Sequence, residues 1–229
     1  TRAEFGLLYS TLKAIQASKI LSLELLVTGM HTLPRYKLSL KEIHLSQIPI
    51  AGLVSISEHG NMLSWLSQEI LGIAEYCKKN LPDCILVLGD RDEALAGAIV
   101  GSHLGIPVAH IHGGDVSGQT TVDQLNRDAI TQLATYHFAA TKKSADRISS
   151  MKQSSQIFRV GAPGIDTLKT VNRVSRATVA KNFSLSTSQH WMLIIMHSEP
   201  LEKKVSFKNQ ILSVIQAVKE FPAEKILVY

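Results

Sequence analysis

The chain has 229 residues, of which 45% are apolar and 19% charged, so it can bury a core, and neither disorder nor a membrane-spanning helix is expected. The net charge is +5, and the basic residues are scattered apart from the pairs Lys78-Lys79, Lys142-Lys143 and Lys203-Lys204, with which aromatic side chains do not interleave; this favours a small anionic ligand over nucleic acid. Two cysteines, Cys77 and Cys84, are too few for a disulfide framework and no signal sequence opens the chain, so we expect a cytoplasmic protein that binds no membrane.

Hydrophobic periodicity predicts alternating helices and strands along most of the chain. Apolar residues at helical spacing predict helices over 4–18, 61–80 (with Asn61 as N-cap), 91–105, 122–135, 142–151 and 203–221. Short apolar runs predict strands over 21–29, 83–90, 106–112, 136–141, 156–161, 191–199 and 224–229. The polar stretch 167–190 predicts a helix and a linker. The fold class is therefore α/β, with parallel sheets and helices on both faces.

The pattern changes after residue 166, and this predicts two domains. Residues 1–166 are expected to form a first Rossmann-like domain. Residues 167–229 are expected to form a linker and the beginning of a second α/β domain, because one strand–helix–strand unit cannot bury its own faces. The chain also enters its first helix as though a strand preceded it, so we expect a fragment of a longer protein.

Polar groups follow four of the predicted strands, within residues 28–31, 89–91, 112–115 and 161–164. The carboxyl ends of parallel strands meet at one edge of a sheet, which is where ligands bind in such folds. Glycine recurs in all four stretches, and His31, Asp90, His112 and Asp115 accompany it. The sequence therefore predicts a binding or catalytic site at this edge.

Residues 109–118, AHIHGGDVSG, allow three interpretations. His110 and His112 share one face if the strand continues through both, and with Asp115 they could bind a metal ion. Alternatively, the histidines are hydrogen-bonded structural residues at the end of a strand. In the third interpretation, Gly113 and Gly114 let backbone N–H groups approach a phosphate or sugar, while His112 and Asp115 supply acid–base groups.

Charged residues near the other predicted strand ends also have two interpretations each. Asp90 could be the N-cap of the following helix in a capping box with Glu93, or it could face a substrate. Asp123 and Arg127 are four residues apart, so they could form a helical ion pair, or both could face a cleft where Arg127 binds anionic oxygens.

Three further residues complete the candidate set, and known nucleotide motifs are missing. Arg2 precedes a helix N-terminus, which favours an anion. His31 follows a strand, and His197 ends the first strand of the second domain, whereas His137 is expected to be a core residue. The sequence contains no G-x-G-x-x-G, P-loop, G-x-S-x-G or C-x-x-C motif, which disfavours hydride transfer, P-loop chemistry and nucleophile-elbow hydrolysis.

Five motifs in order resemble the hydrolysing UDP-N-acetylglucosamine 2-epimerase family, which includes UDP-N,N'-diacetylbacillosamine 2-epimerases. They are TRAEFGLLYSTLKAI, LLVTGMH, GDRDEALAGAIVGSHLGIPVAHIHGGDVSG, DQLNRDAITQLATYHFAAT and RVGAPGID, with a weaker likeness at IIMHSEP. The resemblance implies two Rossmann-like domains of the GT-B type, with the second truncated here, and a site between them. It also implies a UDP-sugar substrate, no metal or other cofactor, and a homodimer or homotetramer.

The resemblance further implies how the reaction runs: a base removes the C2 proton, UDP leaves from C1, and water adds to a 2-acetamidoglucal to give N-acetylmannosamine. The catalytic residues would be Asp90, His112, Asp115 and Asp123. Substrate would be bound by Arg2, His31, His110, Gly113, Gly114, Arg127 and His197. Many members carry Glu in place of His112 and His in place of Asp128. Which carboxylate is the C2 base stays open.

Three alternatives remain at this point. A non-hydrolysing 2-epimerase would interconvert the two UDP-sugars and release nothing. A non-catalytic sugar-nucleotide-binding fragment would bind without turnover, since the half of the second domain that holds the nucleotide in such folds is missing. A metallohydrolase would use His110, His112 and Asp115.

Overall fold

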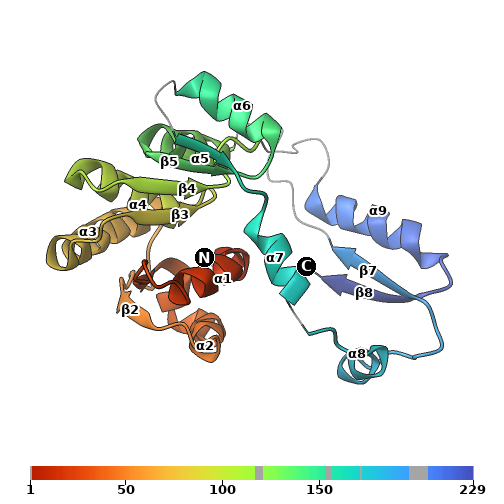
Figure 1. Ribbon diagram of the computed structural model, residues 1–229. Helices are drawn as coiled ribbons and strands as arrows, with labels where there is room; N and C mark the ends of the chain where they lie inside the picture. The colour runs from red at the N-terminus through yellow and green to blue at the C-terminus, as the bar shows by residue number, and fades with distance from the viewer. Residues whose placement is uncertain (1, 117–120, 153–155, 171, 196–205, 229) are drawn as a thin grey trace. The chain divides into compact units, whose positions relative to one another are not determined.

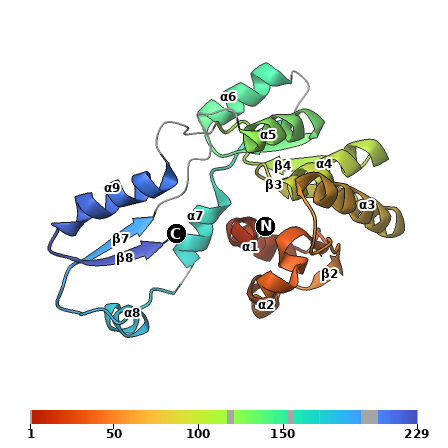
Figure 2. The same ribbon diagram turned by 180° about the vertical axis from the view of Figure 1, so that it is seen from behind.

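The computed structural model describes residues 2–116, 121–152, 156–170, 172–195 and 206–228. The chain divides into two compact units, Thr1–Val171 and Asn172–Tyr229, which are considered separately below. Figure 1 shows their helices and strands, and Figure 2 shows them from behind. No helix among the described residues is both long and apolar enough to cross a membrane.

The first unit alternates helices and strands, as the sequence predicts. Its strands are β1 (Leu25–Val27), β2 (Ile50–Leu53), β3 (Ile85–Leu88), β4 (Val108–Ile111), β5 (Tyr136–Ala139) and β6 (Gln156–Arg159). Its α-helices are α1 (Arg2–Gln16), α2 (Lys37–Leu45), α3 (Met62–Asn80), α4 (Asp92–Leu104), α5 (Val122–Leu133), α6 (Lys142–Met151) and α7 (Pro163–Thr170). Two 3₁₀ turns, η1 (Gly29–Thr32) and η2 (Pro34–Tyr36), follow β1.

The strands of this unit form two parallel sheets. One has the order β3-β4-β5-β6, and the other pairs β1 with β2. In the larger sheet Leu88 lies opposite Ile111, and Ile111 lies opposite Phe138. These pairings bring the carboxyl ends of β3, β4 and β5 to one edge, so the predicted parallel α/β class is confirmed.

Helix α4 carries small side chains on its buried face, which lets it pack closely on the sheet. It contacts β3 and β4 and the neighbouring helices α3 and α5. Ala96 and Ala98 are completely buried, and a Cβ added at Gly101 would lie 2.4 Å from the side chain of Val108. Alanine and glycine are therefore required along α4 because larger side chains would push it away from β4.

The starts of α3, α5 and α6 follow the expected capping chemistry, whereas α4 has no side-chain cap. The Asn61 side chain accepts a hydrogen bond from the backbone N–H of Ser64 and completes a capping box, which confirms the predicted N-cap. The Thr121 and Thr141 side chains cap α5 and α6 by accepting a hydrogen bond from the backbone N–H of Gln124 and of Ser144. The prediction of Asp90 as the N-cap of α4 is wrong, because Arg91 occupies that position and makes no side-chain cap.

Residues 29–53 contain elements that periodicity did not predict, namely η1, η2, α2 and β2. Pro34 and Pro49 interrupt this stretch, so neither helical spacing nor strand alternation continues long enough to be recognised. The consequence is a second parallel strand pair at the start of the chain.

The second unit contains α8 (Arg176–Phe183), β7 (Trp191–Ile195), α9 (Phe207–Lys219) and β8 (Glu224–Val228). Strands β7 and β8 are parallel, with Trp191 opposite Glu224 and Ile195 opposite Val228. The guanidinium of Arg176 lies 3.8 Å from the centre of the Trp191 ring. This cation–π contact packs α8 against the strand pair. The predicted strand–helix–strand pattern of this region is confirmed within the described residues.

Candidate active site

Arg127 joins the carboxyl ends of β3 and β4. Its guanidinium makes an ion pair with Asp90, which follows β3, and donates a hydrogen bond of 2.9 Å to the backbone carbonyl of His112, which follows β4. Both side chains are largely but not fully buried, with 14% of Arg127 and 21% of Asp90 exposed. The pair therefore lies at a partly open edge of the sheet, where a ligand could reach it.

The environment of Asp90 favours proton transfer. Burial raises the pKa of its carboxyl above the ordinary value, and the neighbouring Arg127 opposes this shift. A carboxylate that is partly desolvated and held by a guanidinium is more basic than one in water and has a fixed orientation. Such a group can act as a general base or acid.

His112 and Asp115 form a second acid–base pair at the same edge. His112 Nδ1 lies 2.8 Å from Asp115 Oδ2, and Ser144 Oγ donates a hydrogen bond of 2.5 Å to Asp115 Oδ1. Because a carboxylate accepts, Nδ1 carries the proton, and Nε2 is left as the basic nitrogen. None of the described residues bonds to Nε2, and 17% of the side chain is exposed. The imidazole can therefore exchange a proton with a ligand.

The two glycines between His112 and Asp115 are required by packing. Gly114 has a φ of +76°, and a Cβ there would lie 2.3 Å from the Ser144 carbonyl oxygen. A Cβ at Gly113 would lie 2.9 Å from the His110 ring. The glycines thus let the loop pack against α6 and His110. Their expected contact with substrate stays a prediction.

His110 lies beneath this loop rather than beside His112. It is completely buried, its Nε2 lies 2.8 Å from the Gly89 carbonyl oxygen, and burial lowers its pKa to about 4. Strand β4 ends at Ile111, and His112 has a left-handed φ of +64°, so the alternation expected to place both histidines on one face stops before His112. Among the described residues no group of three His, Cys, Asp or Glu side chains could hold a metal ion.

The expected partnership of Asp123 with Arg127 does not form. Arg127 pairs with Asp90, whereas Asp123 makes an ion pair of 3.8 Å with Arg91, in which about half of each side chain is exposed. Asp123 nevertheless lies in the first turn of α5, one helical turn before Arg127. It remains beside the site, although its predicted catalytic role is untested.

The other expected site residues are placed as follows. His31 lies in η1 and is buried, with 6% exposed, against a cavity between β1 and β3. The predicted core residue His137 is completely buried. His197 lies outside the described residues, and Arg2 begins α1 but its side chain is not among those described.

Several polar residues that the sequence did not single out stabilise the site. Ser144 bonds to Asp115, and Asn126 donates a hydrogen bond of 3.0 Å to Asp92. Arg147 holds Asp128 through two bonds of 2.7 and 2.8 Å. Ser144 lies three residues after the cap Thr141, a spacing that indicates only a helix start. The sequence offered no signal for its contact with Asp115, 29 residues away.

Comparison with solved structures supports the fold. The chain matches the crystal structure of UDP-GlcNAc 2-epimerase from Neisseria meningitidis bound to UDP-GlcNAc with a TM-score of 0.86 at 20% identity, over 100% of this chain and 64% of that one. The Methanocaldococcus jannaschii UDP-GlcNAc 2-epimerase, in complex with UDP-GlcNAc and UDP, matches with a TM-score of 0.79 at 21% identity, over 99% and 63%. The expected GT-B fold class is thereby confirmed.

Sequence comparison is more specific. The chain is 39% identical over 223 residues to the UDP-N,N'-diacetylbacillosamine 2-epimerase (hydrolyzing) of Legionella pneumophila, spanning 95% of this chain and 58% of that protein. It is 34% identical to a Neisseria meningitidis UDP-N-acetylglucosamine 2-epimerase, spanning 81% and 49%. The chain thus spans about half the length of these relatives. The family model described as UDP-N-acetylglucosamine 2-epimerase matches residues 13–229. The chain therefore belongs to the UDP-N-acetylglucosamine 2-epimerase family.

Proposed function

We propose that this chain carries the acid–base groups of a hydrolytic 2-epimerase that acts on a UDP-linked 2-acetamido sugar. The observation that carries the proposal is the juxtaposition of Asp90–Arg127 and His112–Asp115 at neighbouring strand ends. Epimerisation at C2 needs one group to remove a proton and another to return it on the opposite face. The two pairs, which Arg127 connects, supply one group for each of these two proton transfers.

The proposed reaction is an elimination followed by hydration. A base takes the C2 proton, the C2–H electrons form the C1–C2 double bond, and the C1–O bond breaks with its electron pair leaving on UDP. Water then adds to the 2-acetamidoglucal: hydroxide bonds to C1, and a proton reaches C2 on the face opposite to the one that was lost. The products are UDP and a free 2-acetamido sugar with inverted C2.

Charge complementarity supports binding of the diphosphate at this edge. Departure of UDP is aided by positive groups that stabilise the leaving oxygens. Helices α4 and α5 both begin at the edge, so their N-terminal N–H groups favour an anion, and Arg127 adds a guanidinium. We assign leaving-group stabilisation to these groups, together with Arg2 at the start of α1. Proton transfer is assigned to Asp90, His112 and Asp115, with Asp123 assisting.

Two substrates are compatible with these groups. The 39% identical relative named for hydrolysis of UDP-N,N'-diacetylbacillosamine favours a 2,4-diacetamido sugar, and we expect that substrate to give the higher kcat/KM. UDP-N-acetylglucosamine, which would yield N-acetylmannosamine, is the second candidate. A non-hydrolysing reaction is the alternative, because the name of another relative, UDP-N-acetylglucosamine 2-epimerase, does not specify hydrolysis.

The test is NMR of each UDP-sugar with the purified protein in deuterated water. Free UDP and a 2-epimerised sugar deuterated at C2 would support hydrolytic elimination. A 2-epimerised UDP-sugar would assign the non-hydrolysing reaction instead. Ligand-dependent melting without turnover would indicate a binding fragment, and activity that a chelator abolishes would indicate a metallohydrolase.

Matched variants test the site assignment. Asp90→Asn and Asp115→Asn should each lower UDP release at least about 100-fold because each removes a proton-transfer group. Asp146→Asn is the control, because Asp146 is an exposed residue of α6 that pairs only with Lys142 among the described residues. Wild-type release from both site variants would contradict the assignment.

A further inference from the structure

One face of α5 carries polar side chains at a spacing that usually faces a core. Residues three and four apart lie on the same side of a helix. The residues at these positions are Gln124, Arg127, Asp128 and Thr131, and two of them are buried, with 7% of Gln124 and 0% of Thr131 exposed. Buried polar groups need hydrogen-bond partners. The partners therefore show what this face of α5 holds in place.

This face bonds to both ends of the loop formed by residues 112–115. At one end, Arg127 donates a hydrogen bond to the backbone carbonyl of His112. At the other end, Gln124 Nε2 donates a hydrogen bond of 3.4 Å to the backbone carbonyl of Asp115. Helix α5 therefore fixes the backbone of this loop, in addition to the bond that Ser144 makes to the Asp115 side chain.

A carboxylate determines which end of the Gln124 amide faces the loop. Gln124 Nε2 also donates a hydrogen bond of 3.0 Å to Asp128 Oδ1. A backbone carbonyl and an ionised carboxylate only accept hydrogen bonds, so the amide has to present its two N–H donors to them. If the amide turned over, Oε1 would face two acceptors, and both hydrogen bonds would be lost.

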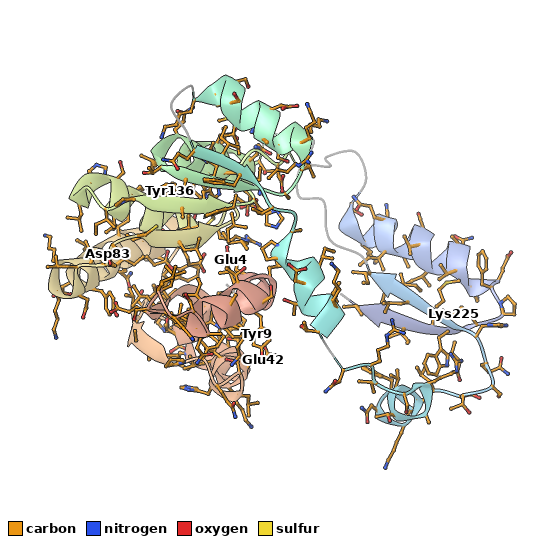
Figure 3. All side chains as sticks on the ribbon, in the orientation of Figure 1. Glu4, Tyr9, Glu42, Asp83, Tyr136 and Lys225 are labelled. Atoms are coloured by element: carbon orange, nitrogen blue, oxygen red, sulfur yellow. The ribbon has the colours of Figure 1, made fainter. Side chains whose placement is uncertain are left out.

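Arg147 of α6 holds the carboxylate of Asp128. Its Nη1 and Nη2 donate hydrogen bonds of 2.7 and 2.8 Å to Oδ1 and Oδ2, and this two-point contact fixes the plane of the carboxylate. The contact with Arg147 also lowers the pKa of Asp128 below its ordinary value, so the carboxylate is ionised at neutral pH. Figure 3 draws the side chains of both helices and labels Tyr136, at the start of the strand β5 that connects α5 to α6.

We propose that Asp128 and Arg147 are positioning residues for the acid–base pair His112–Asp115, and that they act through the amide of Gln124. Arg147 holds the carboxylate, the carboxylate selects the amide orientation, and the amide keeps the Asp115 backbone where its side chain meets His112. None of the three side chains needs to touch the substrate. Because it concerns that pair, the proposal deepens the function proposed above and rests on it.

Gln124→Met tests the contact with the loop. Methionine is similar in size but has no N–H donor, so the variant loses both bonds of the amide and keeps the ion pair of Asp128 with Arg147. We expect kcat for UDP release to fall about tenfold, with KM changed less than about twofold. Gln132→Met is the matched control and should keep the wild-type kcat, because Gln132 is an exposed residue of α5 whose amide donates to the Met151 carbonyl.

A charge exchange separates positioning from stability. Asp128→Arg alone would place two guanidinium groups together and should lower Tm. Adding Arg147→Asp restores an ion pair between α5 and α6, so the double variant should recover most of the lost Tm. The exchanged pair nevertheless presents N–H donors to Gln124, which turns the amide and breaks its bond to the Asp115 carbonyl. We therefore expect kcat of the double variant to stay about tenfold below wild type.

The tautomer of His112 gives a readout that needs no turnover. The proton lies on Nδ1 in the wild type because Asp115 accepts it. In ¹⁵N NMR, Gln124→Met and the double variant should show a fraction protonated on Nε2, whereas Gln132→Met should not. If no protein released UDP, wild type included, the proposed function would fail, and the tautomer would still decide this proposal. A wild-type tautomer in both site variants, or recovery of kcat together with Tm in the double variant, would overturn it.

Discussion

Ser144 Oγ donates a hydrogen bond of 2.5 Å to Asp115 Oδ1 and so ties the loop after β4 to the first turn of α6. Thr141 Oγ1 lies 2.7 Å from Ser144 Oγ, and the opposite oxygen of Asp115 bonds to His112. The carboxylate is therefore held from α6 while it orients the imidazole. Groups of this kind control activity without touching the substrate.

Ser144→Ala should lower kcat about tenfold with little change in KM, because Asp115 loses the donor that fixes its orientation toward His112. The pH profile of kcat should shift as well, which a purely structural loss would not cause. Ser144→Thr retains a hydroxyl and should recover part of the activity. Ser150→Ala, on the same helix but exposed, is the control. Unchanged kcat and pH profile in Ser144→Ala would refute the positioning role.

Gly114→Ala should destabilise the protein more than Gly105→Ala, although both residues have positive φ, at +76° and +71°. At Gly105 nothing lies within 4 Å of an added Cβ, so only the backbone strain remains, about 1–2 kcal/mol. At Gly114 the Cβ would lie 2.3 Å from the Ser144 carbonyl oxygen, which adds roughly 1–3 kcal/mol. Urea unfolding of both variants measures the difference, and equal losses would show that the loop relaxes away from α6.

Glu69→Gln should flatten the dependence of stability on pH. Burial, and then the neighbouring Glu93 and Asp92, raise the pKa of the Glu69 carboxyl to about 8. The folded protein therefore keeps this proton up to about pH 8, whereas the unfolded chain loses it above its ordinary pKa of 4.5. The wild type should lose stability as pH rises through this window, by at most about 1.4 kcal/mol per pH unit for one proton.

The measurement is the free energy of unfolding in urea at several values between pH 5 and pH 8 for wild type and Glu69→Gln. Other buried carboxyls are present in both proteins, so the difference in slope isolates Glu69. We expect the glutamine variant to be the more stable protein at pH 8. Parallel curves for the two proteins would show that Glu69 is ionised in the fold.

His110 and His137 should remain neutral well below the usual pKa of histidine. Burial lowers the pKa of each to about 4, with Lys152 contributing at His137. Because both folded values lie below the unfolded value, these histidines contribute stability that is lost as pH falls from about 6.5 to 4. Their imidazole NMR shifts should stay constant from pH 8 to pH 5, while the urea-unfolded chain titrates near pH 6.5. Titration of the folded signals near that value would refute the prediction.

The strand ends could be predicted from the sequence because apolar runs are followed by Gly, His and Asp. Asp90 and His112 indeed follow neighbouring strands, β3 and β4. The partner of Arg127 could not be predicted, because local spacing favours Asp123, whereas Asp90 is 37 residues away and is brought close only by the sheet. The sequence also could not show that His112 departs from the alternating side-chain directions of β4. A left-handed φ at a non-glycine residue leaves no signature in composition.

The register of β3 against β4 has a practical consequence for protein engineering. Leu88 lies opposite Ile111, and this pairing sets Asp90 beside His112. A slip of one residue would move one group by about 3.3 Å along the strand and reverse the faces of its side chains. The turns at the opposite edge, such as the one around Gly105, are not subject to this constraint. A reporter domain or affinity tag inserted there should leave the geometry of the acid–base groups intact.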